Sequence, residues 1–149
     1  MTCTFFGHRE CPPAVLPKLK ATLENLINYH DVYRFLVGSQ GEFDLYAYRT
    51  LRELKEQYPQ ITYRIVLAYP PDKRAKMDFI DYSDTILPDG IEKVPRRFAI
   101  SFRNKWMIEQ SAYAVIYITH PFGGAAQFAQ LAEKRKKICI NLALDVLPP

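Results

Sequence analysis

The feature that most constrains the fold is an apolar run at residues 112–119 with a helical pattern on each side. The run, Ala-Tyr-Ala-Val-Ile-Tyr-Ile-Thr, is apolar at successive positions rather than at alternate ones. A strand that is apolar on both faces belongs in the middle of a parallel sheet covered by helices. A helix-period segment from residue 98 precedes the run, and Pro121-Phe-Gly-Gly-Ala125 follows it and opens a second helical pattern. The order helix, buried strand, glycine turn and helix predicts an α/β fold.

The rest of the chain alternates short β-prone runs with helical patterns. We predict strands at residues 2–6, 32–37, 62–67, 112–119 and 137–141, and at most a short strand at 85–87. Helical patterns are found at residues 12–27, 43–54, 96–111 and 124–136. This alternation favours a Rossmann-like, doubly wound and mostly parallel sheet with helices on both faces. A chain of 149 residues is most simply one domain, spanning residues 1–149.

Composition and charge narrow the classes of function. Apolar residues at 48% and charged residues at 24% are typical of a globular protein, and no run is long enough to span a membrane. The three cysteines lack metal-ligand spacing, so we expect reduced thiols in a cytoplasmic protein, with no metal and no cofactor. A net charge of +4 suits an anionic ligand but falls short of what a strong nucleic-acid binder shows, so we expect no nucleic-acid partner.

The alternation lapses between Tyr69 and Pro95. This segment contains two adjacent prolines, a charged run and several aromatic residues. Long loops without structure of their own are usually functional or disordered, and the aromatic content argues against disorder. We expect a partly ordered lid beside the site. Asp78, Asp81 and Asp84 recur at every third position in it, and a solvated acidic face explains them better than a metal site.

Glycine-containing turns follow three of the predicted strands. In a doubly wound sheet, ligands bind at the carboxyl ends of the strands, where glycines let a ligand approach the backbone and helix N-termini present free N–H groups. The alternative for each turn is a purely structural role, and the acidic residues of the second turn are also explained as helix-dipole and capping residues. The candidate ligand-binding residues in these turns are Gly7, His8 and Arg9; Gly38, Ser39, Gln40, Gly41 and Asp44; and Phe122, Gly123, Gly124 and Ala125.

The predicted helix of residues 96–111 has an unusual distribution of charge. Arg96 and Arg97 stand at its N-terminus, where positive charge opposes the helix dipole. One stripe of the helix is formed by Arg96, Ile100, Arg103 and Met107, with Asn104 beside it. That stripe is either a solvated face or an anion clamp. A second stripe, formed by Phe98, Phe102 and Trp106, is most simply core packing.

Over nearly its whole length the chain resembles the YpsA-like branch of the SLOG superfamily. This Rossmann-like group includes the Lonely Guy phosphoribohydrolases and the DNA-processing protein A family. The matching motifs, in order, are Phe6-Gly7-His8-Arg9, Gly38-x-x-Gly41-x-x-Asp44, Arg103-Asn104 and Gly123-Gly124. The resemblance implies a site for a nucleotide-derived ligand at the carboxyl ends of the parallel strands.

Departures from the Lonely Guy motif limit what the resemblance implies about catalysis. Arg103 matches that family's arginine before the central strand. Ala126 and Gln127, however, stand where the motif has Gly-Thr, and Gln130 stands where it has the catalytic glutamate. A neutral amide cannot stabilise an oxocarbenium ion or take a proton as a carboxylate does. Asp44 and Glu109 are the candidate substitutes for that glutamate.

These observations predict a cytoplasmic binding module for a nucleotide or nucleotide-sugar ligand, acting as a sensor or signalling component. The first alternative is a nucleoside monophosphate N-glycosidase, in which Arg103 would be the catalytic residue. The second alternative is single-stranded DNA binding, against which the modest net charge and the lack of an accessory domain both count. A homo-oligomer is left open, because Tyr46, Tyr48 and Trp106 fit either a core or an interface. Cys11 is interpreted as an unreactive thiol near a helix start rather than as a nucleophile.

Overall fold

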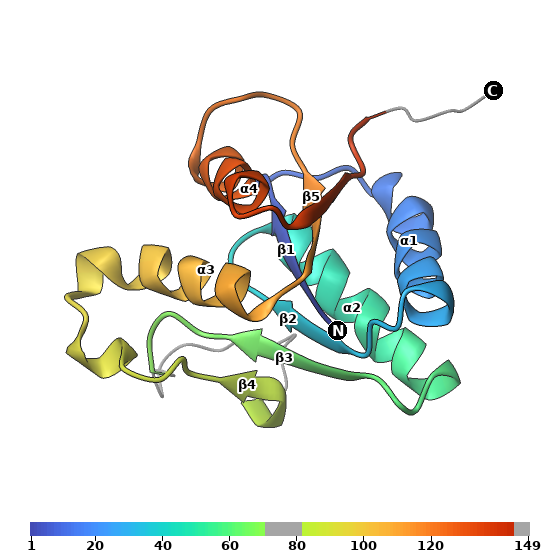
Figure 1. Ribbon diagram of the computed structural model, residues 1–149, viewed down its shortest axis with the longest axis horizontal. Helices are drawn as coiled ribbons and strands as arrows, with labels where there is room; N and C mark the ends of the chain where they lie inside the picture. Colours follow the sequence, from blue (N-terminus) through green and yellow to red (C-terminus); the bar gives the residue numbers. More distant parts are fainter. Residues whose placement is uncertain (71–81, 145–149) are drawn as a thin grey trace.

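A six-stranded parallel sheet forms the centre of the protein (Figure 1). The structure is a computed structural model and describes residues 1–70 and 82–144. The strands lie in the order β4-β3-β2-β1-β5-β6, and each neighbouring pair is parallel. They are β1 (Thr2–Gly7), β2 (Arg34–Val37), β3 (Thr62–Val66), β4 (Thr85–Ile86), β5 (Tyr113–Tyr117) and β6 (Ile138–Asn141).

This strand order confirms the predicted doubly wound α/β fold. The chain builds outward from β1 through β2 and β3 to β4, and then returns to place β5 on the other side of β1. The direction of winding therefore reverses at β1, and the turns that leave β1 and its two neighbours meet at the carboxyl edge of the sheet.

Two helices cover each face of the sheet. On one face, α1 (Val15–Tyr29) and α2 (Glu42–Gln57) share an apolar cluster with Phe5 and Phe35. On the other, α3 (Ala99–Gln110) and α4 (Gly124–Lys134) share a cluster with Phe6 and Leu36. Because both faces are covered, residues that are adjacent along a central strand are all buried, which explains the continuous apolar runs in the sequence.

The start of α3 differs from the prediction. Arg96–Phe98 form a short 3₁₀ turn, and the α-helix begins only at Ala99. The assignment of the aromatic stripe to the core is wrong for Phe98, whose side chain is 51% exposed, while Phe102 and Trp106 are half-buried. The helix instead buries Ala99, Arg103 and Met107, which lie four residues apart on one ridge. A buried arginine on that ridge obscures the apolar pattern from which the helix face was predicted.

The segment between Tyr69 and Pro95 is described only in part. The predicted lid and the acidic residues Asp78 and Asp81 fall wholly or partly on residues 71–81, which lie outside the described residues. The described part contains the 3₁₀ turns Tyr82–Asp84 and Ile91–Lys93, with the expected short strand β4 between them. Asp84 accepts a hydrogen bond of 2.9 Å from the Tyr48 hydroxyl of α2, so this carboxylate has a structural partner.

No helix in residues 1–70 or 82–144 is both long enough and apolar enough to cross a membrane.

Candidate functional site

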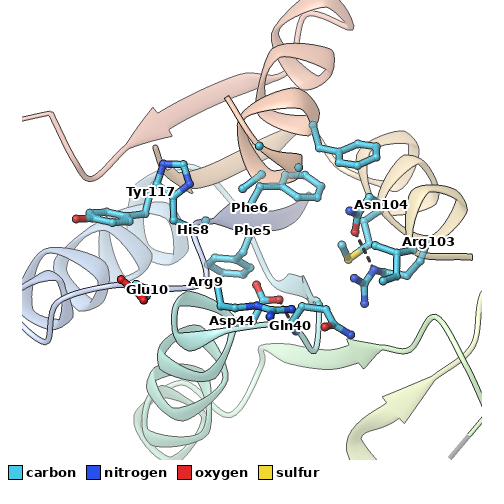
Figure 2. A pocket seen from close by; sticks show the side chains of 18 of the residues that line it. Phe5, Phe6, His8, Arg9, Glu10, Gln40, Asp44, Arg103, Asn104 and Tyr117 are labelled. Atoms are coloured by element: carbon cyan, nitrogen blue, oxygen red, sulfur yellow. Dashed lines mark hydrogen bonds between the residues drawn. The ribbon is translucent and has the colours of Figure 1, made fainter. Parts of the chain in front are cut away.

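A pocket of about 730 Å³ opens at the carboxyl edge of the sheet, where the turns after β1, β2 and β5 meet α3 (Figure 2). Ligand sites of α/β proteins are expected at this reversal of strand order. Most of the residues predicted from the sequence line this one pocket. They are Gly7, His8, Arg9, Gly38, Gln40, Asp44, Arg103, Asn104, Gly123, Gly124 and Ala125.

Three predicted residues, Ser39, Gly41 and Phe122, are not among those that line the pocket. Gly41 has a structural role instead. Its φ is +92°, and a Cβ atom there would lie 2.7 Å from the Cα atom of Arg9. This close approach lets the N–H of Glu42 donate a 2.8 Å hydrogen bond to the Arg9 carbonyl oxygen, which ties the turn after β1 to the start of α2.

The pocket also contains residues that sequence reasoning missed, most of them apolar or aromatic. Sequence position gave a signal for several of them, because Ile100 and Met107 are one helical turn from Arg103, and Thr119 and His120 lie between the central strand and the paired glycines. Phe6 and Phe128 were not distinguishable from ordinary core residues. The full set of missed residues is Phe5, Phe6, Glu10, Ile100, Met107, Tyr117, Thr119, His120 and Phe128.

Arg103 and Asp44 form the buried polar part of the pocket. Arg103 is only 2% exposed; its Nη1 donates to the Val66 carbonyl oxygen at 2.9 Å and its Nε to Asn104 Oδ1 at 2.8 Å. Asp44 accepts a 2.9 Å hydrogen bond from the Gln40 N–H. These contacts fix both side chains at the ends of β2 and β3. The sequence left open whether the arginine stripe is a solvated face or an anion clamp. Because Arg103 is buried and lines the pocket, it does not belong to a solvated face.

Gly38 is what allows this pair to approach the end of β2. A Cβ atom there would lie 2.8 Å from Asp44 Oδ2 and 3.5 Å from Arg103 Cζ. Since side chains rarely tolerate contacts so short, any larger residue would displace the carboxylate.

Burial shifts the pKa of both partners in the direction that disfavours charge. It raises the pKa of Asp44 to about 6, against the opposing effects of the Gln40 N–H and the nearby Arg103. It also lowers the pKa of Arg103, and the neighbouring Asp44 partly restores it. Near neutral pH the pair is ionised but incompletely solvated. A ligand that supplies hydrogen bonds to either group therefore lowers the free-energy cost of keeping its charge buried.

The paired glycines after β5 present bare backbone to the pocket. Gly123 precedes α4 with a φ of +95°, and no side chain caps the helix. A Cβ atom built at Gly123 or at Gly124 would meet no atom within 4 Å. Protein packing therefore does not require glycine at position 124, and the space beside the first N–H groups of α4 is open. Such N–H groups are a favourable site for an anion.

A stack of aromatic rings leads from the pocket wall to the surface. The His8 and His120 rings are stacked with centroids 3.8 Å apart, and the His120 and Phe122 rings with centroids 3.9 Å apart. The Thr119 N–H donates to His8 Nε2 at 2.9 Å, so this nitrogen carries a lone pair and the His8 ring is neutral. Burial and the neighbouring His120 both lower the pKa of His8.

The candidate substitutes for a catalytic glutamate are separated in the structure. Glu109 is exposed, and its Oε1 lies 3.9 Å from Arg135 Nη1. Gln130 lines a different pocket of about 290 Å³, which shares Thr119 and His120 with the main pocket. Among the described residues, the carboxylates that line the main pocket are Asp44 and Glu10.

The cysteines of the described residues are free thiols that do not lie in a cluster of metal-ligating side chains. All three cysteines are free, and burial with the nearby Glu42 raises the pKa of Cys11 to about 11, the opposite of what a nucleophilic thiol needs. No group of three or more potential metal ligands occurs in residues 1–70 and 82–144.

Comparison with known proteins shows a likeness in fold. No protein-family model matches the sequence, and no curated protein matches it. The structure is similar to that of DNA processing protein A from Streptococcus pneumoniae, with a TM-score of 0.69 and 13% identity over 99% of this chain and 52% of that one. It is also similar to DNA processing protein A from Helicobacter pylori, with a TM-score of 0.66 and 14% identity over 95% of this chain and 64% of that one.

The chain therefore spans between about half and two thirds of the length of these two proteins. The Helicobacter pylori protein binds single-stranded DNA. This finding overturns the expectation that nucleic acid is not a partner for a chain of this kind. The expectation rested on net charge, which sums over the whole surface, whereas binding responds to the local potential in a cleft. These likenesses show that the chain has the Rossmann-like fold of DNA processing protein A.

Proposed function

We propose that this chain binds single-stranded DNA at the pocket on the carboxyl edge of the sheet. The observation that carries the proposal is the open backbone at Gly123 and Gly124, which faces the same pocket as Arg9 and Arg103. A strand phosphate at the N-terminus of α4 would accept hydrogen bonds from free N–H groups, and the arginines would complement its charge. The likeness in fold to a protein that binds single-stranded DNA supports the same proposal.

Exposed side chains near the pocket suit a strand that extends beyond it. Ile100, which lines the pocket, is separated by Ala99 alone from the turn that contains Arg96, Arg97 and Phe98. The guanidinium of Arg96 lies 4.3 Å from the centre of the Tyr69 ring, and that of Arg97 lies 4.8 Å from the centre of the Phe98 ring. Cations and aromatic rings together are the usual lining of paths for single-stranded nucleic acid, because they serve both phosphates and bases.

Arg9 offers the cleanest test, because its side chain is exposed and its removal leaves no buried group unpaired. Fluorescence anisotropy with a labelled oligothymidylate should give an affinity that falls with salt. Arg9→Gln should weaken binding about ten-fold and reduce the salt slope by about one phosphate contact. Arg135→Gln is the matched control, because it removes the same charge from the exposed C-terminal end of α4 and should change little. Equal effects of the two variants, or no binding by the wild type, would refute the proposal.

A second candidate is a free nucleotide or nucleotide-sugar ligand, as predicted from the sequence. The pocket volume of about 730 Å³ favours it, since sites for small molecules usually have about 300–1,000 Å³. A thermal-shift screen with nucleoside monophosphates and ADP-ribose distinguishes the two candidates. A ligand at about 100 times its Kd should stabilise the protein by about 2.7 kcal/mol.

We also propose that the chain belongs to the YpsA-like branch, that residues 1–149 form a single domain and that the protein works in the cytoplasm. The motif order described above supports the first of these. Three free cysteines, two of them buried, support a reducing compartment.

A further inference from the structure

Phe122 is the outermost ring of the stack that it forms with His120 and His8. His8 and His120 line the pocket, whereas Phe122 lies outside it and is 68% exposed. One face of the Phe122 ring is covered by His120 at a centroid distance of 3.9 Å with an interplanar angle of 22°. The opposite face of Phe122 therefore accounts for its exposure, and the stack ends in an uncovered aromatic surface.

The position of Phe122 on the chain ties that surface to the anion site. Only Gly123 separates Phe122 from Gly124, so the Cα atom of Phe122 lies within about 7 Å of the Cα atom of the first residue of α4. A phosphate at those N–H groups and a base on Phe122 would then belong to neighbouring parts of one strand. Phe122 also cannot be explained by packing against the core, because its main ring contact is with His120.

The His8 ring holds the inner end of the stack in a fixed orientation. The His8 ring is held by the Thr119 N–H at Nε2, and its plane lies within 12° of the plane of His120. Rings that are fixed in advance lose little conformational freedom when a base is added to them.

We propose that Phe122 is a stacking platform for a nucleobase of the bound strand, next to the phosphate at the N-terminus of α4. This inference rests on the proposed function and adds to it the part of the ligand that is recognised. The platform accepts any base, because stacking uses the ring face that all bases share. It predicts that the protein prefers strands with bases to a bare sugar-phosphate backbone.

Anisotropy with two oligonucleotides tests the platform. One is an oligothymidylate, and the other has the same length with abasic sites in place of the bases. Phe122→Leu should weaken binding of the oligothymidylate about ten-fold and leave binding of the abasic strand unchanged. Phe122→Trp keeps an aromatic ring at this position and should bind the oligothymidylate at least as tightly as the wild type does. Tyr29→Leu is the control, because Tyr29 is 78% exposed at the end of α1, at the opposite edge of the sheet.

The outcomes separate the two proposals. If the wild type binds neither strand, the proposed function and the platform are both wrong. If the wild type binds and Phe122→Leu binds the oligothymidylate equally well, only the platform is wrong. An equal loss for both strands in Phe122→Leu would also overturn it, because such a loss comes from a change in the turn rather than from a missing stack.

Discussion

Arg103 shows how far a single residue can be predicted from its neighbours in the sequence. Its place before the central strand predicted a role at the site, and it does line the pocket. Its burial was not predictable, because the carbonyl oxygen that holds it belongs to Val66, far away along the chain. Asp44 is similar: the turn pattern placed it at the site, but its proximity to the guanidinium depends on the small size of Gly38.

Gly124→Ala should change ligand binding without lowering the stability of the protein. The residue occupies the first position of α4, has no unusual φ, and would place its Cβ in open space. Alanine should therefore leave the protein unchanged or stabilise it by about 0.4–1 kcal/mol in urea unfolding. The added methyl group should obstruct the approach of a phosphate and weaken oligonucleotide binding about five-fold, as for one lost hydrogen bond. Unchanged affinity in a stable Gly124→Ala protein would place the phosphate elsewhere.

The elements of the fold were predicted more completely than the side-chain contacts between them. Strand positions followed from apolar runs, and the glycine turns after β2 and β5 marked where α2 and α4 begin. The failure at α3 has a physical cause, since its buried ridge includes an arginine and its first aromatic residue faces solvent. The contact between the turns after β1 and β5, through His8 and His120, brings together residues more than a hundred positions apart, and no local pattern predicts it.

This contact between turns should depend on pH. The folded protein lowers the pKa of His8 from its ordinary value of 6.5, so the unfolded chain takes up the proton more readily. The contribution of His8 to stability is therefore fully present above about pH 6.5 and is lost as the pH falls through the folded pKa. Protonation would also abolish the acceptor for the Thr119 N–H.

Urea unfolding from pH 5 to pH 8 measures this contribution as the difference between wild type and His8→Gln. The difference should shrink as the pH falls. Taking a difference is necessary because Asp44, whose pKa is raised to about 6, affects stability with the opposite sign in part of the same range. His30→Gln, at the exposed end of α1 and away from the contact between His8 and Thr119, is the matched control substitution. A difference that does not vary with pH would show that His8 is not held as the neutral acceptor.

The topology of the sheet determines which side of the protein can bind a ligand. The reversal of strand order at β1 places the turns after β1, β2 and β5 at one edge, and the pocket is there. Sequence reasoning identified this edge because parallel strands end together. It was wrong about nucleic acid because a net charge of +4 says nothing of how the charges are arranged. Arg9, Arg103 and the exposed Arg96 and Arg97 belong to the turns and the helix at this edge.

The most direct test of the account is to map the binding surface by NMR, following backbone amide shifts as an oligothymidylate is added. The account predicts the largest changes at Gln40 and at Gly123 to Ala125, on the carboxyl edge, with changes at His8 and Phe122 beside them. The amides of His30 to Tyr33, at the amino edge of the same sheet, should remain unshifted. Changes gathered at the amino edge, or no changes at the three glycine turns, would contradict it.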